Sequence, residues 1–154
     1  MRILAVDYGD ARTGMAVSDL SNTMPGEAWV FSGYTPEKVA EHIVSETAAR
    51  NVGTIVLGYP KNMDGTAGPR AEKSEALAEI IRGLTDVPVV MWDERRTTVD
   101  AHRILTETGK RGKKRKKTVD AVAATLILEG YLNSLRNAVS DAAAPDGKIS
   151  AEKK

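Results

Sequence analysis

The apolar residues in the first 33 residues of the chain fall into short runs, each with the length and composition of a β-strand. Residues 2–8 and 13–18 are two such runs, separated by the connection GDAR, and the stretch EAWVFSG that follows has the same character. Short runs of β-branched and aromatic residues bounded by turn residues are typical of strands joined by tight connections. This part of the sequence therefore predicts three strands that follow one another as a meander.

The next segment, TPEKVAEHIVSETAARN, carries its apolar residues at helical spacing. Thr35 suits the N-cap, Pro36 suits the first helical position, and Glu37 favours the positive end of the helix dipole. We therefore expect a helix from about residue 36 to residue 50. His42 lies on this helix and is expected to be a surface or helix-packing residue.

Two continuous apolar runs, TIVLGYP and VPVVMWDE, are typical of strands that are buried on both faces. Between them, an amphipathic pattern from Arg70 to Leu84 predicts a second helix. TTVDAHRILTETG then predicts a third helix that ends at Gly109, and TVDAVAATLILEGYLNSLRN predicts a long fourth helix with Thr118 as its N-cap. We expect the basic segment between them, residues 110–117, to be a loop.

The order of these elements, βββαβαβαα, is that of a single α/β domain. It predicts a mixed five-stranded sheet with an antiparallel opening, parallel crossover strands and helices on both faces. We assign residues 1–137 to this domain. Residues 138–154 offer little bulk to bury and are expected to form a disordered C-terminal tail.

The amino-acid composition limits which kinds of protein and which kinds of functional site are possible. A chain of 154 residues is long enough to bury the core of one domain, in which we expect Trp29 and Trp92. The absence of Cys excludes disulfides and thiolate sites. The sequence also shows no apolar leader and no apolar run long enough to span a membrane. Together these features predict a cytoplasmic protein with no membrane partner. The net charge is only +1, but seven of the eight residues in KRGKKRKK are Lys or Arg.

Acidic residues end two of the predicted strands and begin the last helix. Asp7 closes the first strand, Asp93 and Glu94 close the fifth, and Asp120 lies in the first turn of the helix. Because ligands bind such sheets at the carboxyl ends of the strands, these acids form the oxygen-ligand set that Mg²⁺ or Mn²⁺ prefers. Turn and helix-start chemistry also explains each acid alone. Strand alternation puts Asp93 and Glu94 on opposite faces, without showing which of them shares the face of Asp7.

Glycine-rich and basic segments flank the same edge of the sheet. In DYGDARTG, Gly9 and Gly14 would let the backbone pass close to a phosphate, and in GYPKNMDGTAGPRAE Lys61 and Arg70 would meet phosphate oxygens. The basic segment would neutralise several phosphates beside the acids. A hairpin turn, a strand-to-helix connection and a solvated loop are the alternative interpretations of these three segments.

The four motifs occur together in the order and spacing of a known family. DYG with RTGMAVSD, then GYPKNMDGT, DERRTT and KKTVDAVAA, resemble the YqgF/RuvX family, a bacterial branch of the ribonuclease-H-like nucleases, over about residues 1–137. The resemblance implies a ribonuclease-H-like three-layer α/β/α fold and a nuclease site that uses Mg²⁺ or Mn²⁺. It also implies a cytoplasmic role in maturing the 5′ end of pre-16S rRNA, while related members have been proposed as Holliday junction resolvases.

Matching the motifs position by position implies that Asp7, Glu94 and Asp120 are the catalytic and metal-binding acids. The implied nucleic-acid contacts are Arg12, Lys61, Asn62, Arg70, Arg95 and Arg96, to which the basic segment adds Lys113, Lys114, Arg115, Lys116 and Lys117. The chain departs from the family pattern at Tyr59 and Arg96, where members often have Leu. Neither departure touches the implied metal ligands.

The sequence leaves four functions open. The first is a metal-dependent endonuclease on structured RNA, such as pre-rRNA or a pre-ribosomal particle, and the second is a resolvase of branched DNA, which should be a homodimer rather than a monomer. The third is a phosphotransferase of the actin and sugar-kinase type, whose first phosphate loop resembles DYGDARTG. Such enzymes close two domains around the nucleotide, whereas 154 residues supply only one. A non-catalytic nucleic-acid- or ribosome-binding module would depend on the basic segment and not on Asp120.

Overall fold

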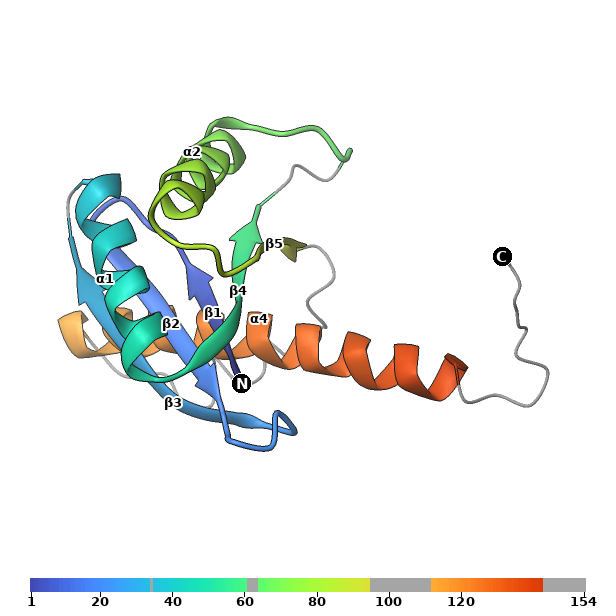
Figure 1. The fold of residues 1–154 in the computed structure, drawn as a ribbon. Coiled ribbons are helices and arrows are strands. Elements are labelled where there is room, and N and C mark those ends of the chain that lie inside the picture. The colour runs from blue at the N-terminus through green and yellow to red at the C-terminus, as the bar shows by residue number, and fades with distance from the viewer. Residues whose placement is uncertain (34, 61–63, 95–111, 143–154) are drawn as a thin grey trace.

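Five strands form one mixed sheet with the order β3-β2-β1-β4-β5 (Figure 1). The computed structural model describes residues 1–33, 35–60, 64–94 and 112–142. The strands are β1 (Arg2–Asp7), β2 (Arg12–Ser18), β3 (Pro25–Ser32), β4 (Val52–Tyr59) and β5 (Val89–Asp93). β2 pairs antiparallel with β1 and β3, whereas β4 runs parallel to β1 and β5. The predicted meander and parallel crossovers are confirmed.

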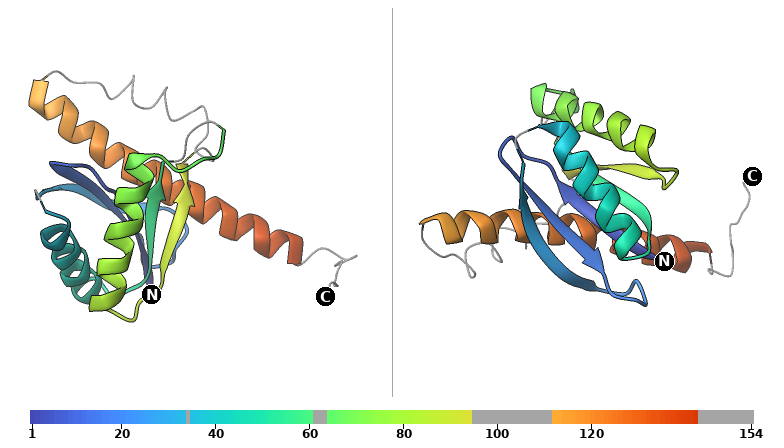
Figure 2. Two further views of the ribbon diagram at one scale, coloured as in Figure 1. Left: turned by 90° about the horizontal axis from the view of Figure 1, so that it is seen from above. Right: turned by 60° about the vertical axis from the view of Figure 1, so that its left-hand side comes forward.

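Helices cover both faces of this sheet, so the three-layer arrangement is confirmed as well. α1 (Pro36–Ala49) and α2 (Pro69–Leu84) pack against each other on one face, and α4 (Gly112–Ala142) crosses the other face (Figure 2). The predicted third helix, residues 97–109, lies outside the described residues. Within the described ranges, no helix combines the length and the apolar character needed to cross a bilayer.

The start of α1 follows the predicted capping pattern. The Thr35 hydroxyl accepts a hydrogen bond from the backbone N–H of Lys38 at 3.2 Å, and Pro36 opens the helix. This bond satisfies one of the amide groups that a helix start leaves without a partner. The predicted helix boundaries therefore agree with the structure to within a residue.

The last helix differs from its prediction at both ends. α4 begins at Gly112, so residues 112–117 are helical and not a loop, and Thr118 lies inside the helix instead of capping it. Lys and Arg are good helix formers, so a dense run of them extends a helix as readily as it forms a solvated loop. α4 also continues to Ala142, which makes the start of the predicted tail helical, while residues 143–154 lie outside the described ranges.

Strand alternation divides the core between the two faces of the sheet. The side chains of the sheet that pack toward α1 and α2 include Leu4, Val6, Met15, Val17, Ile55 and Leu57. Those that pack toward α4 are Ile3, Ala5, Ala16, Val56 and Trp92, which meet Ala124, Ile127 and Leu128 of the helix. Asp7 continues the alternation of Ile3 and Ala5, and it therefore lies on the α4 face.

The two tryptophans have different environments. Trp92 is a core residue with 4% exposure, as predicted, whereas Trp29 is only partly buried, on β3. The Trp29 indole N–H donates to Nε2 of His42 at 3.3 Å, and the Arg50 guanidinium lies 4.2 Å from the Trp29 ring centroid. His42 also stacks on Phe31 with the ring centroids 4.1 Å apart. His42 is thus a helix-packing residue that joins α1 to β3.

Candidate active site

Three acids meet at the carboxyl edge of the sheet, on the face that α4 covers. Asp7 is the last residue of β1, Glu94 directly follows β5, and Asp120 lies in α4. The negative charges of Glu94 and Asp120 both act on Asp7. The structure therefore brings together the three acids that the motif match implies.

Gly14 allows α4 to approach the sheet closely enough for this meeting. It lies directly opposite Asp7 in the β1–β2 pair, and a Cβ at this position would lie 2.0 Å from the carbonyl oxygen of Asp120. The prediction that Gly14 admits a phosphate is therefore wrong, because the helix backbone fills that space. Gly9 serves the tight connection between β1 and β2, since its Cβ would lie 2.4 Å from the Arg12 carbonyl oxygen.

Gly58 makes room for the second acid. A Cβ at Gly58 would lie 2.5 Å from Oε2 of Glu94, so the Glu94 carboxylate lies over the β4 backbone. Gly58 pairs with Trp92 of β5, whose side chain faces α4, and Glu94 continues that alternation two residues later. Of the two neighbouring acids that the sequence could not separate, Glu94 and not Asp93 therefore shares the face of Asp7.

The two carboxylates nearest the sheet are short of positive charge. Burial raises the pKa of Asp7 to about 7, and the charges of Glu94 and Asp120 add to this rise while Arg70 opposes it. Burial also raises the pKa of Glu94, again with Arg70 in opposition. Neighbouring carboxyl groups whose pKa values are raised by burial are often found at functional sites. A cation bound here would favour the charged form of both groups.

Asp120 has a cationic partner of its own. Nε of Arg12 lies 2.9 Å from Oδ2 of Asp120, and the side chains of the pair are 39% and 25% exposed. The motif match placed Arg12 among the substrate contacts, whereas the structure pairs it with an implied metal ligand. Because 108 residues separate Arg12 from Asp120 along the chain, the sequence pattern did not show this pairing. The available signal was that Arg12 precedes Gly14 by two residues and shares its face of β2.

Comparison with known proteins identifies the family. The RuvX family model, described as Holliday junction resolvase, matches residues 1–134. The chain belongs to the RuvX family. A protein of Halothermothrix orenii named "Putative pre-16S rRNA nuclease" is 47% identical over 134 residues, which cover 86% of this chain and 95% of that protein. A protein of the same name from Clostridium acetobutylicum is 46% identical over 137 residues, which cover 88% and 100%.

Solved structures share the fold of this RuvX-family chain at low sequence identity. The T. thermophilus RuvC in complex with Holliday junction substrate has a TM-score of 0.60 at 10% identity, with 87% of this chain and 96% of that chain covered. The Fowlpox virus resolvase in complex with Holliday junction DNA has a TM-score of 0.58 at 14% identity, with 88% and 99% covered. The predicted family and its ribonuclease-H-like α/β fold are confirmed, and the names of the relatives are those of nucleases.

The acids of this RuvX-family site supply the donor chemistry that a divalent ion needs. Carboxylate oxygens are the ligands that Mg²⁺ and Mn²⁺ prefer, and the burial of Asp7 near two other acids suits a cation. Among the described residues, no three acidic or histidine side chains converge closely enough to ligate one ion as they stand. The ion pair with Arg12 gives the Asp120 carboxylate another partner, so Asp120 would have to leave Arg12 to join Asp7 and Glu94.

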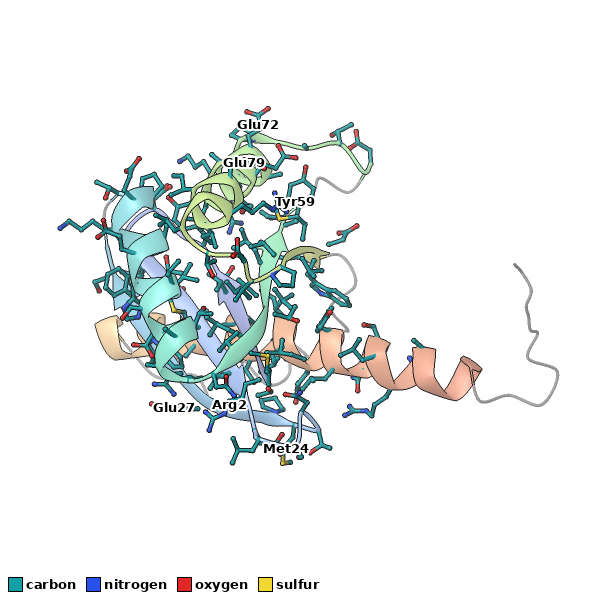
Figure 3. The ribbon with its side chains drawn as sticks, in the orientation of Figure 1. Arg2, Met24, Glu27, Tyr59, Glu72 and Glu79 are labelled. Carbon is teal, nitrogen blue, oxygen red and sulfur yellow. The ribbon has the colours of Figure 1, made fainter. Side chains whose placement is uncertain are left out.

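The first turns of α2 border the acidic cluster. Arg70 is exposed there, and its charge acts on both Asp7 and Glu94. Two contacts fix this end of the helix: Nζ of Lys73 lies 2.8 Å from Oδ1 of Asp10, and the Tyr59 hydroxyl donates to Glu75. In Figure 3, Tyr59 lies at the same end of the molecule as Glu72 of α2.

Only some of the other implied nucleic-acid contacts fall within the described residues. Lys61, Asn62, Arg95 and Arg96 lie outside the described residues. Residues 113–117 belong to the first turns of α4, about one to two turns before Asp120.

A hollow of about 510 Å³, lined by Arg2, Ser18, Asp19 and Glu27, lies at the opposite end of the sheet from the acids. Figure 3 shows Arg2 and Glu27 at that end.

Proposed function

We propose that this protein is a divalent-metal-dependent endonuclease that matures the 5′ end of pre-16S rRNA in the cytoplasm. The observation that carries the proposal is that Asp7, Glu94 and Asp120 lie at one edge of the sheet, on the face that α4 covers, with the pKa of Asp7 raised to about 7. The substrate is suggested by the name shared by relatives that are 40–47% identical to this chain. A cation held by these acids would assist cleavage of a phosphodiester bond.

The roles of the acids follow from their positions. Asp7 and Glu94 would hold Mg²⁺ or Mn²⁺, because both lie on the α4 face with raised pKa values, and Asp120 would complete the ligand set. When bound, the ion would activate a water nucleophile and neutralise charge on the phosphate. Glu94 lies against the bare backbone of Gly58, which leaves room for its carboxylate beside β4.

Basic residues around the acids would bind the RNA backbone. Arg70 stands at the start of α2, and the basic residues 113–117 occupy the turns of α4 that lead to Asp120. In the sequence, Lys61 and Asn62 come shortly after β4, and Arg95 and Arg96 directly follow Glu94. Contacts of this kind position the strand without reading its sequence, so we expect binding to weaken strongly with salt.

Resolution of branched DNA is the second candidate function. It is favoured by the description of the family model, and by the fold shared with two resolvases solved with Holliday junctions. Junction resolution requires two cuts related by two-fold symmetry, and this predicts a homodimer with two acidic sites. An RNA nuclease needs one site and can act as a monomer.

The deciding experiment offers both substrates to the same proteins. Wild type, Asp7→Asn and the control Asp86→Asn, which alters an exposed acid outside the site, are incubated with a 5′-extended pre-16S rRNA fragment and with a four-way DNA junction, each in Mn²⁺ and in EDTA. Metal-dependent RNA trimming that Asp7→Asn abolishes and Asp86→Asn retains is expected. Cleavage of the junction alone would transfer the proposal to the resolvase. Binding of both substrates without any cleavage would favour the non-catalytic module.

A further inference from the structure

Arg12 contacts one of the proposed metal ligands, and this position suggests a role for it. We infer that Arg12 competes with the divalent cation for Asp120, an inference that rests on the proposed metal site. Binding of the cation would then release the Arg12 guanidinium to a phosphate of the substrate. Arg12 would then be a positioning residue that couples metal binding to nucleic-acid binding.

The geometry makes Arg12 the nearest alternative to a cation for Asp120. Arg12 lies on the α4 face of β2 two residues before Gly14, and the backbone of Asp120 rests directly on Gly14. The helix is therefore fixed at this point, while the Nε–Oδ2 pair of 2.9 Å involves side chains that are both in contact with solvent. A pair of this kind can open without any movement of the backbone.

The charges around the cluster show why the two partners of Asp120 exclude each other. Arg70 acts on Asp7 and Glu94, and the cationic contact of Asp120 is Arg12. A divalent ion held between Asp7 and Glu94 would attract the Asp120 carboxylate and repel the guanidinium that now holds it. Binding of the ion and formation of the ion pair are thus alternatives, and each weakens the other by the same factor.

The released guanidinium would remain beside the acids, because the backbone of Arg12 is held in the sheet by its pairing with Ser32 of β3. Its planar fork of donors suits two oxygens of a phosphate better than one carboxylate oxygen. We therefore expect the cation to increase the affinity of the protein for nucleic acid, in part through Arg12. The same coupling means that bound nucleic acid increases the affinity for the cation.

The first experiment measures Mn²⁺ binding without nucleic acid, from the electron paramagnetic resonance signal of free Mn²⁺. Arg12→Ala is expected to bind Mn²⁺ more tightly than wild type by up to about fivefold, the size that a partly exposed ion pair allows. Arg12→Gln, which keeps most of the packing, should show the same direction. The matched control is Arg82→Ala, because Arg82 pairs with Glu79 at 2.8 Å at the other end of α2. Equal or weaker Mn²⁺ binding by folded Arg12→Ala and Arg12→Gln would overturn the inference.

The second experiment measures binding of a labelled pre-16S rRNA fragment by fluorescence anisotropy, in Ca²⁺ and in EDTA. The gain in affinity that Ca²⁺ gives to wild type should fall severalfold in Arg12→Ala and persist in Arg82→Ala. An undiminished gain in Arg12→Ala would overturn the coupling.

Asp7→Asn separates the inference from the function on which it rests. This variant should lose Mn²⁺ binding if the metal site is correct, whatever the behaviour of Arg12→Ala. Retained Mn²⁺ binding in Asp7→Asn would overturn the metal site and the inference together. Loss of Mn²⁺ binding in Asp7→Asn with unchanged binding in Arg12→Ala would overturn the inference alone.

Discussion

Asp7 and Gly14 lie directly opposite each other across β1 and β2, and the space beside Gly14 is filled by the backbone of Asp120. A residue without a side chain thus sets the distance between an acid of the sheet and an acid of the helix. Gly58 has the corresponding role for Glu94 on the neighbouring strand. The positions of Asp120 and Glu94 therefore depend on the absence of a side chain at Gly14 and at Gly58.

Gly14→Ala is expected to displace α4 from β2. The added Cβ would meet backbone atoms of Asp120 at 2.0 and 2.6 Å, and backbone cannot rotate away as a side chain can. We expect the free energy of unfolding to fall by at least about 2 kcal/mol, measured by urea denaturation. Mn²⁺ binding should weaken in parallel, because Asp120 moves with the helix.

The control for this substitution is Gly83→Ala, in the last turns of α2. A Cβ at Gly83 meets nothing within 4 Å, and Ala is the better helix former. Its stability should rise by about 0.5–1 kcal/mol. Similar losses of stability in the two variants would contradict the close approach at Gly14.

Asp7 is expected to make the metal-free protein less stable at higher pH. Its pKa is 3.8 without the fold and about 7 within it, so the folded state binds the proton more tightly. The stability due to Asp7 is therefore present below about pH 4 and is lost as the pH rises through about 7. In EDTA, we expect urea denaturation to show wild type losing about 2 kcal/mol between pH 5.5 and pH 8 from this group. Asp7→Asn should lose most of this dependence, and Asp86→Asn should keep it.

Glu94 and Asp93 should differ in their effect on cleavage although they are neighbours. Glu94→Gln removes a charge from the face of Asp7, and we expect it to lower the rate of metal-dependent cleavage by roughly 100-fold or more. Asp93→Asn alters the opposite face of the strand and should have a much smaller effect. Single-turnover cleavage in Mn²⁺ at saturating protein would compare the two, and equal losses would contradict the assignment of Glu94.

His42 is expected to weaken the fold in acid. Burial lowers its pKa, and the neutral ring accepts the N–H of Trp29 through Nε2, so protonation removes that hydrogen bond. As the pH falls from about 6.5, the unfolded chain takes up the proton first, and stability is lost until the pH passes the lowered pKa of the folded state. The charged neighbours that act on the ring are Glu46 and Arg50.

The measurement for His42 needs a background without Asp7, because Asp7 titrates in the same range with the opposite sign. Urea denaturation of Asp7→Asn at about pH 7.5 and about pH 5 would be compared with Asp7→Asn/His42→Gln. The double variant should lose less stability on acidification than the single variant. An equal loss would show that protonation of another group causes it.

Local patterns in the sequence were sufficient for most of the fold. The cap at Thr35 and the alternating side chains of β1 are determined by neighbouring residues, and such signals can be interpreted one segment at a time. The prediction of a loop was wrong for residues 112–117, which form the first turns of α4. A dense run of charged residues indicates exposure to solvent and does not determine the conformation of the backbone. Helix propensity was the signal that would have extended the helix.

The candidate site could be predicted only in part. Parallel strands end at one edge, so the acids could be expected to converge there, and the catalytic role given to them remains a prediction. To choose between Asp93 and Glu94, one must know on which face of the sheet the Trp92 side chain lies. That face depends on how β5 is aligned with β4. The contact of Arg12 with Asp120 depends on the packing of the last helix on the second strand, and no local pattern contains that information.

The docking of α4 on Gly14 has a consequence for the chain during its synthesis. Arg12 leaves the ribosome 108 residues before Asp120, and the sheet that carries Asp7 and Glu94 lacks the third acid until the last helix packs against it. A growing chain therefore cannot assemble the complete cluster while α4 is still being made. For a protein proposed to cut ribosomal RNA, the topology delays the complete acidic cluster until the fold is finished.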